Sequence, residues 1–524
     1  MKARIRIAAC ATAGVLTMGG LVTASAPSAI AATTVRIRVT GIDRSGHRTP
    51  VYATIFGTTY PPKFTTPGNA VSVPKGPAWV GTEVDTTTGT QHDLVSATLV
   101  MRRVTISRAA TITLDARPGK LVKFSLAVPG AQETSETVQG CVGGNFVGGP
   151  EVEASSTSPV PLYAVPVSVK GFGFGYDSTW QTAAASYLIS GQSTGGIPRA
   201  PRYRASPAGM AKVQLALRSG DAIGSYQDIR VIRLSNCGIQ QFLPAENPAG
   251  SITQYLSSGP YEIWTDGADA FWINNSRYAA RHSYSDTFGG AAFGPAQDFP
   301  SVWEHEIQFT SESPIGDPQH QSFECCDMSG MTFSYRGHVV KHAIQSQYRA
   351  TRTFTAHLPA AGSAWYTFQL VGWRRVPGVK VPAGILSPRI TMVWHFRTSP
   401  QRGVPIDAKF MPVTLTRFVP RGLNLQNQAP PGANTVVAVR VNRPPGRGSC
   451  CTSPPKYPLT TVRVQASANG GKTWQTVKLV RQGSSYWLAT VPDPMSGYVA
   501  LRSTVIDSHG DKSVETILRA YAIS

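Results

Sequence analysis

Side chains able to do acid–base chemistry or to hold a metal ion gather between residues 304 and 342. The group consists of Glu304, His305, Glu306, Asp317, His320, Glu324, Asp327, His338 and His342. The pair His305-Glu306 lacks the second histidine of the zinc-peptidase pattern H-E-x-x-H. No complete ligand set follows from the spacing, so no cofactor is expected. The weak metal candidates are His305, Glu306, His338 and His342.

The segment around Glu304 predicts a strand. Ile307 and Phe309 alternate with polar residues, which would turn Glu304 and Glu306 toward solvent about 7 Å apart. That spacing approaches the carboxylate separation of inverting glycosidases, but almost any pair two residues apart on a strand would match it. A solvated strand face is therefore the preferred interpretation. A hydrolase site around Glu304–His342 is the alternative.

Two further motifs carry weaker signals. The run 191–195, GQSTG, matches the G-x-S-x-G of hydrolase elbows, which requires a helix directly after the serine. Pro198 and Pro201 argue against that helix, because proline removes a backbone donor and clashes with the preceding turn. Asp507-Ser508-His509 contains three triad residue types, but adjacent residues cannot converge as a triad does. We therefore predict no catalytic residue, and the interpretation leans away from an enzyme.

The clearest structural signal is the run 460–474, TTVRVQASANGGKTW. Its first half alternates apolar and polar residues, as a half-buried strand does. Asn469-Gly470-Gly471 then accepts the positive φ of a tight turn, and the return strand is expected to begin at Lys472. The run 467–474 resembles the Asp-box hairpin S-x-D-x-G-x-T-W, with Asn469 in place of aspartate. A single copy without a blade-length repeat indicates a stable turn and not glycosidase activity.

The composition is typical of a chain of many strands and turns. Of 524 residues, 41% are hydrophobic and only 15% are charged, with 50 glycines and 40 prolines. The formal net charge is +20. Such a charge could attract an anionic polymer or an acidic protein. No block of five or more basic residues occurs, so scattered surface charge is the preferred interpretation, and no nucleic acid is expected as a partner.

The N-terminus predicts export. Lys2, Arg4 and Arg6 precede an apolar run, and Ala29-Ile30-Ala31 fits the small-x-small cleavage pattern of a signal peptide. Residues 1–31 are therefore predicted to be removed near Ala31, leaving a secreted, extracellular protein. No later run is long enough for a membrane helix.

Six cysteines follow the predicted signal peptide, and an even number in an exported protein suggests disulfides. They allow 15 pairings, among which Cys141–Cys237 is the first expectation. The candidates are Cys141, Cys237, Cys325, Cys326, Cys450 and Cys451.

The predicted fold class is all-β, with tandem β-sandwich domains. Short alternating runs separated by Gly-, Pro- and Thr-rich turns favour this class. Six strand candidates in the last 90 or so residues suit an immunoglobulin- or fibronectin-III-like sandwich. The expected units are a small β-sandwich at 33–125 (carboxypeptidase-regulatory-like or immunoglobulin-like), a β-rich middle region at 126–240, an aromatic-rich β-sandwich at 241–430, and the final sandwich at 431–524.

The C-terminal residues resemble a known family. The run TTVRVQASANGGKTWQTVKLVR and the closing stretch Leu518-Arg519-Ala520-Tyr521 are similar to the ends of large secreted actinobacterial subtilisin-like serine peptidases. Looser similarity extends over most of the chain from about Val35. The family's catalytic motifs D-[ST]-G, H-G-T and G-T-S-M do not occur. The resemblance therefore implies accessory β-domains without the peptidase domain, and no catalytic residue is carried over.

We therefore expect a secreted, non-catalytic protein of several β-domains. Its expected partner is an extracellular protein or an anionic wall polymer. An alternative is a helper that docks to a separately encoded secreted peptidase.

Overall fold

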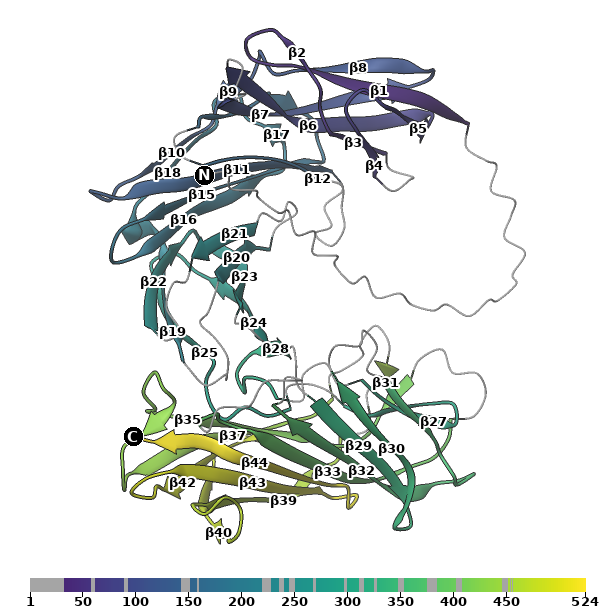
Figure 1. Cartoon of the computed structure of the whole chain (residues 1–524), viewed down its shortest axis with the longest axis vertical. Helices are drawn as coiled ribbons and strands as arrows, with labels where there is room; N and C mark the ends of the chain where they lie inside the picture. The colour runs from purple at the N-terminus through teal and green to yellow at the C-terminus, as the bar shows by residue number, and fades with distance from the viewer. Residues whose placement is uncertain are drawn as a thin grey trace.

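The structure is a computed structural model, and it confirms the all-β class (Figure 1). Among the described residues the one helical element is the single turn η1, Pro207–Gly209. The structure describes residues 33–57, 62–88, 93–142, 151–157, 160–218, 228–234, 240–244, 250–266, 270–295, 299–310, 315–324, 328–346, 353–374, 384–401, 408–444, 451–452, 454 and 456–524.

The N-terminal part stacks three sheets. The middle one is six-stranded: β3 (Ala53–Gly57), β4 (Lys63–Thr65), β6 (Gly76–Thr88), β7 (Asp93–Ile106), β9 (Lys120–Leu121) and β13 (Leu162–Ala164). A four-stranded sheet covers one face: β1 (Thr34–Ile42), β2 (Arg48–Thr49), β5 (Ala70–Pro74) and β8 (Ala110–Asp115). Residues 96–101 of β7 are all buried, because both faces of the six-stranded sheet contribute to hydrophobic cores.

A seven-stranded sheet covers the other face: β11 (Gln132–Val142), β12 (Glu151–Thr157), β15 (Phe172–Gln181), β16 (Ser186–Ser193), β19 (Ala211–Leu217), β22 (Gly250–Leu256) and β25 (Ser283–Phe288). Its far end packs against a five-stranded sheet: β20 (Asp228–Arg233), β21 (Gln240–Pro244), β23 (Gly259–Asp266), β24 (Ala270–Tyr278) and β28 (Gln321–Glu324). Two short pairs complete this part: β10 (Lys123–Leu126) with β18 (Arg202–Ala205), and β14 (Val167–Ser168) with β17 (Gly196–Ile197).

A nine-stranded sheet dominates the C-terminal part (Figure 1). Its strands are β29 (Met328–Tyr335), β30 (His338–Ser346), β32 (Ala364–Trp373), β33 (Arg389–Thr398), β36 (Gln428–Ala429), β39 (Leu459–Ser467), β40 (Gln475–Thr476), β43 (Tyr498–Asp507) and β44 (Lys512–Ile523). Two smaller sheets cover one face of it side by side, so a single sheet serves two hydrophobic cores.

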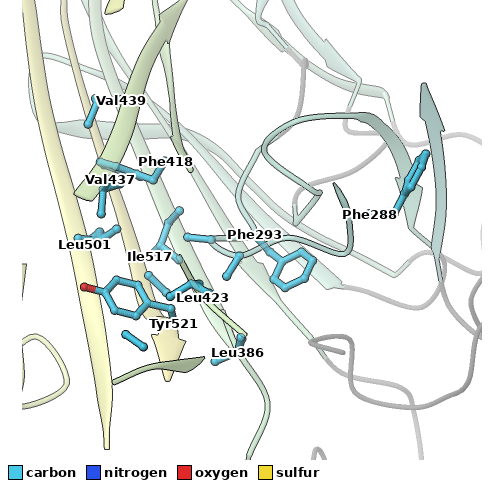
Figure 2. Packing of buried hydrophobic residues seen from close by; sticks show 14 of the residues in the cluster. Phe288, Phe293, Leu386, Phe418, Leu423, Val437, Val439, Leu501, Ile517 and Tyr521 are labelled. Carbon is cyan, nitrogen blue, oxygen red and sulfur yellow. The ribbon is translucent and has the colours of Figure 1, made fainter. Parts of the chain in front are cut away.

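The first of these smaller sheets is five-stranded and packs on β29, β32 and β33: β26 (Ser301–Trp303), β27 (Glu306–Thr310), β31 (Thr353–His357), β34 (Ala408–Phe410) and β38 (Cys451–Thr452). The second is four-stranded and packs on β43 and β44: β35 (Leu415–Pro420), β37 (Asn434–Asn442), β41 (Lys478–Arg481) and β42 (Tyr486–Pro492). Figure 2 shows part of this second core, including Phe418, Ile517 and Tyr521.

Strand pairing crosses each of the three predicted domain boundaries. β13 pairs with β7 across residue 125, β22 pairs with β16 and β19 across residue 240, and β33 pairs with β44 across residue 430. The predicted units therefore share sheets and do not end where a sheet ends. The division of the chain into four independent domains stays a prediction.

Candidate functional site

The structure distributes the described members of the acid–base group of residues 304–342 over four places. Glu304 and His305 form the turn between β26 and β27, and Glu306 opens β27. His338 and His342 lie on β30, at one edge of the nine-stranded sheet. Asp317 and His320 are buried near β25. Glu324 ends β28, while Asp327 lies outside the described residues.

The prediction that Glu304 shares a strand face with Glu306 was wrong. Glu304 has a φ of 52° and belongs to a two-residue hairpin turn, with Trp303 paired to Glu306 across it. The strand begins at Glu306, two residues later than the alternation of Ile307 and Phe309 with polar residues indicated. Glu304, His305 and Glu306 are all exposed, and the ring of His305 stacks on His357. These side chains do not converge on a common point with His342, which contacts Thr332.

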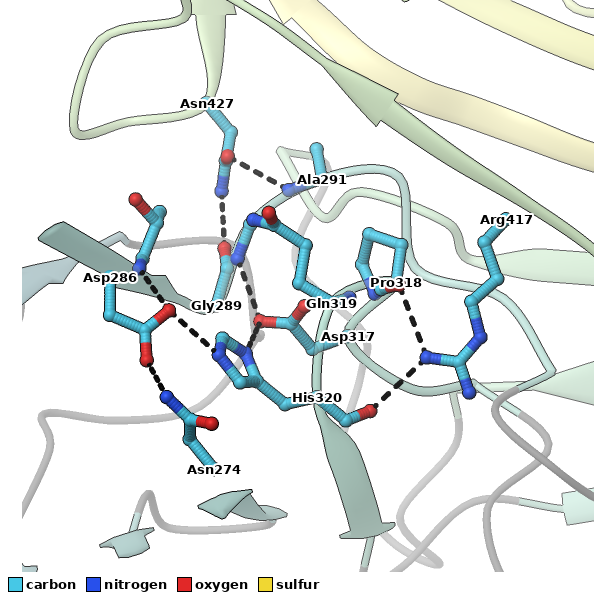
Figure 3. Close-up of polar contacts among 12 residues, drawn as sticks. Asn274, Asp286, Gly289, Ala291, Asp317, Pro318, Gln319, His320, Arg417 and Asn427 are labelled. Carbon is cyan, nitrogen blue, oxygen red and sulfur yellow. Dashed lines mark hydrogen bonds and ion pairs between the residues drawn. The ribbon is translucent and has the colours of Figure 1, made fainter. Parts of the chain in front are cut away.

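His320 is instead the centre of a buried polar cluster (Figure 3). Its side chain is 4% exposed and lies between two carboxylates. Nε2 is 3.0 Å from Asp286 Oδ1, and Nδ1 is 3.2 Å from Asp317 Oδ2. Phe288 stacks on the imidazole at 4.2 Å between ring centroids.

The two carboxylates keep His320 protonated. Burial alone disfavours the imidazolium, but Asp317 and Asp286 outweigh it and raise the pKa of His320 to about 10. Burial would also raise the pKa of Asp286, but the histidine holds it below its ordinary value. Asp286 was not among the candidate acid–base residues predicted from the sequence. The alternation of Tyr284, Asp286 and Phe288 on β25 was the available signal that this carboxylate faces inward.

The cluster joins the middle of the chain to the C-terminal sheets. Asn427 donates to the Gly289 carbonyl at 2.8 Å and accepts from the Ala291 amide at 3.0 Å. Arg417 of β35 donates to the Pro318 carbonyl at 3.1 Å. Each contact closes on another part of the chain, so the described contacts hold the two parts of the molecule together.

A different pattern appears in residues 408–524, where every carboxylate is buried. The four acidic residues are Asp493, Asp507, Asp511 and Glu515, with side chains turned inside the fold. Fourteen lysines and arginines occur in the same range, so it carries half of the net charge of +20. They are Lys409, Arg417, Arg421, Arg440, Arg443, Arg447, Lys456, Arg463, Lys472, Lys478, Arg481, Arg502, Lys512 and Arg519.

Hydrogen bonds explain why these carboxylates stay inside. Asp493 accepts from Thr435 Oγ1 at 2.6 Å and from Tyr521 Oη at 2.7 Å. Asp507 accepts from the amides of His509 and Asp511 in the turn before β44. These internal bonds occupy the acidic groups, so they do not neutralise the basic side chains at the surface.

Glu515 is the most deeply buried of the four, with an exposure of 0%. Its Oε2 accepts from the Thr416 amide at 2.9 Å, between β44 and β35. Burial raises the pKa of this carboxyl to about 8, although the Thr416 amide and the charge of Arg417 lower it in part.

Basic side chains collect on the uncovered face of the nine-stranded sheet. Arg389 and Arg397 project from β33 on the side opposite buried Trp394, and Lys512 does the same on β44. Arg463 is exposed on β39, beside Arg502 of β43. Within the described strands of this sheet, the acidic residues are Asp507 and Glu515, and both are buried. We call this surface the basic sheet face.

Aromatic rings form a row at one edge of the basic sheet face. Trp365 stacks on His395 at 4.9 Å, and His509 stacks on Tyr457 at 4.7 Å. Trp365 and His509 are 6.2 Å apart, which joins the two pairs. Trp365 is 36% exposed, so the row remains accessible beside Arg397 and Lys512.

The hairpin after β39 forms the predicted tight turn, held by side chains. Asn469 Oδ1 accepts from the Thr473 amide at 2.9 Å, and Ser467 Oγ accepts from the Gly471 amide at 3.0 Å. Gly470 and Gly471 have φ values of 70° and 86°, which glycine adopts without strain. The return strand starts at Gln475 and not at Lys472, because these bonds hold residues up to Thr473 in the loop.

A groove opens beside this hairpin, at the edge of the last sandwich. Its volume is about 560 Å³, and residues from β39, β40, β37 and β42 line it. It therefore lies where the nine-stranded and four-stranded sheets separate.

The other predicted features are the disulfides, the G-x-S-x-G run and the signal peptide. Cys141 on β11 is disulfide-bonded, but its pairing with Cys237 stays a prediction. Ser193 ends β16, and a turn and the short strand β17 follow it, so the helix of a hydrolase elbow does not form there. The predicted signal peptide and five cysteines are not fully described: residues 1–31, Cys237, Cys325, Cys326 and Cys450 lie outside the described residues, and the side chain of Cys451 is not placed.

The described part of the chain contains neither a metal-binding cluster of side chains nor a membrane-spanning helix. No group of three or more His, Cys, Asp or Glu side chains there is arranged to hold a metal ion. No helix there is long and apolar enough to cross a membrane.

Comparison with known proteins gives similarity to solved β-domain structures alone. No family model matches the chain, and no curated protein matches it. The FN1–FN3 domains of chicken CNTN1 are 9% identical, with 66% of this chain and 94% of that chain covered and a TM-score of 0.14. A putative membrane anchored protein from Corynebacterium diphtheriae is 11% identical, with 75% and 97% covered and a TM-score of 0.13.

A third similar structure is Escherichia coli alpha-2-macroglobulin activated by porcine elastase. It is 8% identical, with 90% of this chain and 50% of that chain covered and a TM-score of 0.13. Scores this low transfer no property to this chain. The resemblance to subtilisin-like peptidases stays a prediction.

Proposed function

We propose that this chain is an exported, non-catalytic β-sheet protein that binds an anionic cell-wall polymer through the basic sheet face. The observation that carries the proposal is the burial of every acidic side chain in residues 408–524, against fourteen basic residues in the same range. The sequence favoured scattered charge because no basic block occurs. Strand pairing instead gathers basic residues far apart in sequence, such as Arg397, Arg463 and Lys512, onto one sheet.

A polymer suits this surface better than a small anion. The basic sheet face extends over several strands, and its charges are spaced along them instead of converging on one point. Like charges this close repel when unpaired. Burial lowers the pKa of Arg502, and the charge of Arg463 lowers it further by a smaller amount. A chain of anionic groups would pair with such basic side chains at several positions at once.

Among the described residues, Glu304 and Glu306 are exposed around a turn and His320 is enclosed, so their geometry does not support the hydrolase alternative. No contact in the described structure favours the peptidase-helper alternative over the polymer.

Binding to isolated bacterial cell walls tests the proposal. The protein should bind walls that retain their anionic polymers and should not bind walls stripped of them. Raising the salt concentration from about 0.05 M to about 0.5 M should release it, because exposed charges are screened over a Debye length that shortens with salt. The triple variant Arg397→Glu, Arg463→Glu, Lys512→Glu should bind at least about 10-fold more weakly.

A matched variant controls for total charge. Arg38→Glu, Lys120→Glu and Lys123→Glu change the same number of exposed basic residues in the N-terminal part. This control should retain binding. Equal loss in both triple variants would contradict a site on the basic sheet face. Retention on stripped walls or at high salt would contradict an anionic partner.

A further inference from the structure

The groove beside the hairpin combines an apolar floor with polar walls. Ala466, Val477 and Val499 are buried and form its base. Asn434, Gln475 and Thr490 are exposed at its sides. Its volume of about 560 Å³ lies within the range of small-molecule sites.

Some polar side chains of the groove form hydrogen bonds within the protein, and others do not. Ser467, Asn469 and Thr473 are engaged in holding the turn. In the described structure the side chains of Asn434, Gln475 and Thr490 make no hydrogen bond within the protein. Amide and hydroxyl groups offer both donors and acceptors, which suits a ligand carrying several hydroxyl groups.

One charged side chain lines the groove. Lys478, exposed on β41, contributes an ammonium group, and no carboxylate is among the lining residues. An ammonium group that lacks a partner carboxylate favours an anionic group on the ligand.

We propose that this groove binds one sugar unit of the wall polymer, a pyranose that bears a carboxylate. The C–H face of the ring would lie on the apolar floor, its hydroxyls would bond to Asn434, Gln475 and Thr490, and its carboxylate would pair with Lys478. This inference rests on the proposed function and adds recognition of a sugar to attraction by charge. The basic sheet face attracts the polymer, and the groove selects the unit.

Titration with short oligosaccharides tests the groove separately from the polymer. The probe is a tetrasaccharide containing glucuronic acid, and the neutral probe is maltotetraose, both followed by NMR or calorimetry at physiological salt. The acidic probe should bind in a saturable manner and more tightly than the neutral one. Lys478→Gln should weaken binding of the acidic probe about 10-fold, because one charge-assisted hydrogen bond is lost.

Two variants complete the design. Lys123→Gln removes the same charge from an exposed position on β10 that does not line the groove, and it should change tetrasaccharide binding by less than about twofold. Thr490→Trp would fill the groove from an exposed strand position that tolerates an aromatic residue, and it should abolish binding.

The outcomes separate the two proposals. Equal weakening by Lys478→Gln and Lys123→Gln would overturn the groove as the binding site. So would the absence of saturation by the acidic probe up to about 10 mM while the protein still binds cell walls. Saturable tetrasaccharide binding without wall binding would support the groove and contradict the proposed function.

Discussion

Glu515 shows what a single buried carboxyl does to stability. It lies on β44 between Ser513 and Ile517, two residues that also face inward. Glutamate is rarely buried unless paired, so residue type alone would place it at the surface. Its neighbours Thr416 and Arg417 belong to β35, about one hundred residues earlier in the chain.

Replacement of this carboxyl should stabilise the protein above neutral pH. The pKa of Glu515 is raised on folding from 4.5 to about 8, so the folded state holds a proton that the unfolded chain has released. This term favours folding fully at pH values below about 4.5 and is lost as the pH rises through about 8. Glu515→Gln should therefore raise the free energy of unfolding at pH 8 by about 2 kcal/mol or more, with little change at pH 4.

Urea unfolding of both proteins at pH 4 and pH 8 measures this difference. Thr516→Val, at the adjacent outward position on β44, serves as a control that should show no such pH dependence. Equal effects of Glu515→Gln at both pH values would contradict the raised pKa.

The hairpin after β39 is the element that sequence predicted best. Its strand, its glycines and its turn are local features, so they could be read without knowing the rest of the fold. The start of the return strand was predicted three residues early, because the bonds from Asn469 to Thr473 lengthen the loop. The same loop forms one side of the groove, which no local pattern indicated.

Asn469→Ala should destabilise the hairpin by about 1–3 kcal/mol. It removes the acceptor of the Thr473 amide and the donor to Thr473 Oγ1. Chemical denaturation followed by the fluorescence of Trp474, which packs under Arg502, reports on this element. Asn469→Asp retains the acceptor and should stay within about 0.5 kcal/mol of the parent chain. A loss equal to that of Asn469→Ala would show that the acceptor is not what holds the turn.

At the scale of the whole molecule, the His320 cluster decides how the middle and C-terminal parts hold together. Its ion pairs and the Asn427 bridge link β25 and its following loop to β35 and the loop before β36. The pKa of His320 rises on folding, from 6.5 to about 10. Its contribution to stability is therefore fully present below about pH 6.5 and is lost as the pH rises toward 10.

We expect this junction to loosen at alkaline pH. Amide hydrogen exchange of Gly290 and Ala291, whose amides donate to Asp317 and Asn427, should lose protection between pH 7 and pH 10 beyond the intrinsic increase in exchange rate. The triple variant Asp286→Asn, His320→Gln, Asp317→Asn removes the charges together and should show no such pH dependence. Protection that stays constant in the parent chain would contradict the role of the ion pairs.

Much of the candidate site depended on partners that are distant in sequence. Asp317 and His320 were identified as a group with Glu304 and His342, but Asp317 and His320 are buried beside Asp286 of β25, while Glu304 lies in the turn after β26 and His342 on β30. Composition gives the net charge. Which basic side chains lie together on the basic sheet face depends on the register in which β33, β44, β43 and β39 pair.

The sequence by itself determined the β class, most strand positions in the last unit and the glycine turn, because alternation and turn chemistry act over a few residues. The tertiary structure decided which carboxylates are buried, which basic side chains share a surface and where the groove opens. The physical reason is that a strand pattern gives two faces but does not say which sheet will cover either of them. In this protein Glu515 and Lys512 lie three residues apart on one strand, and packing of β35 over one face alone makes the first a buried acid and the second a surface cation.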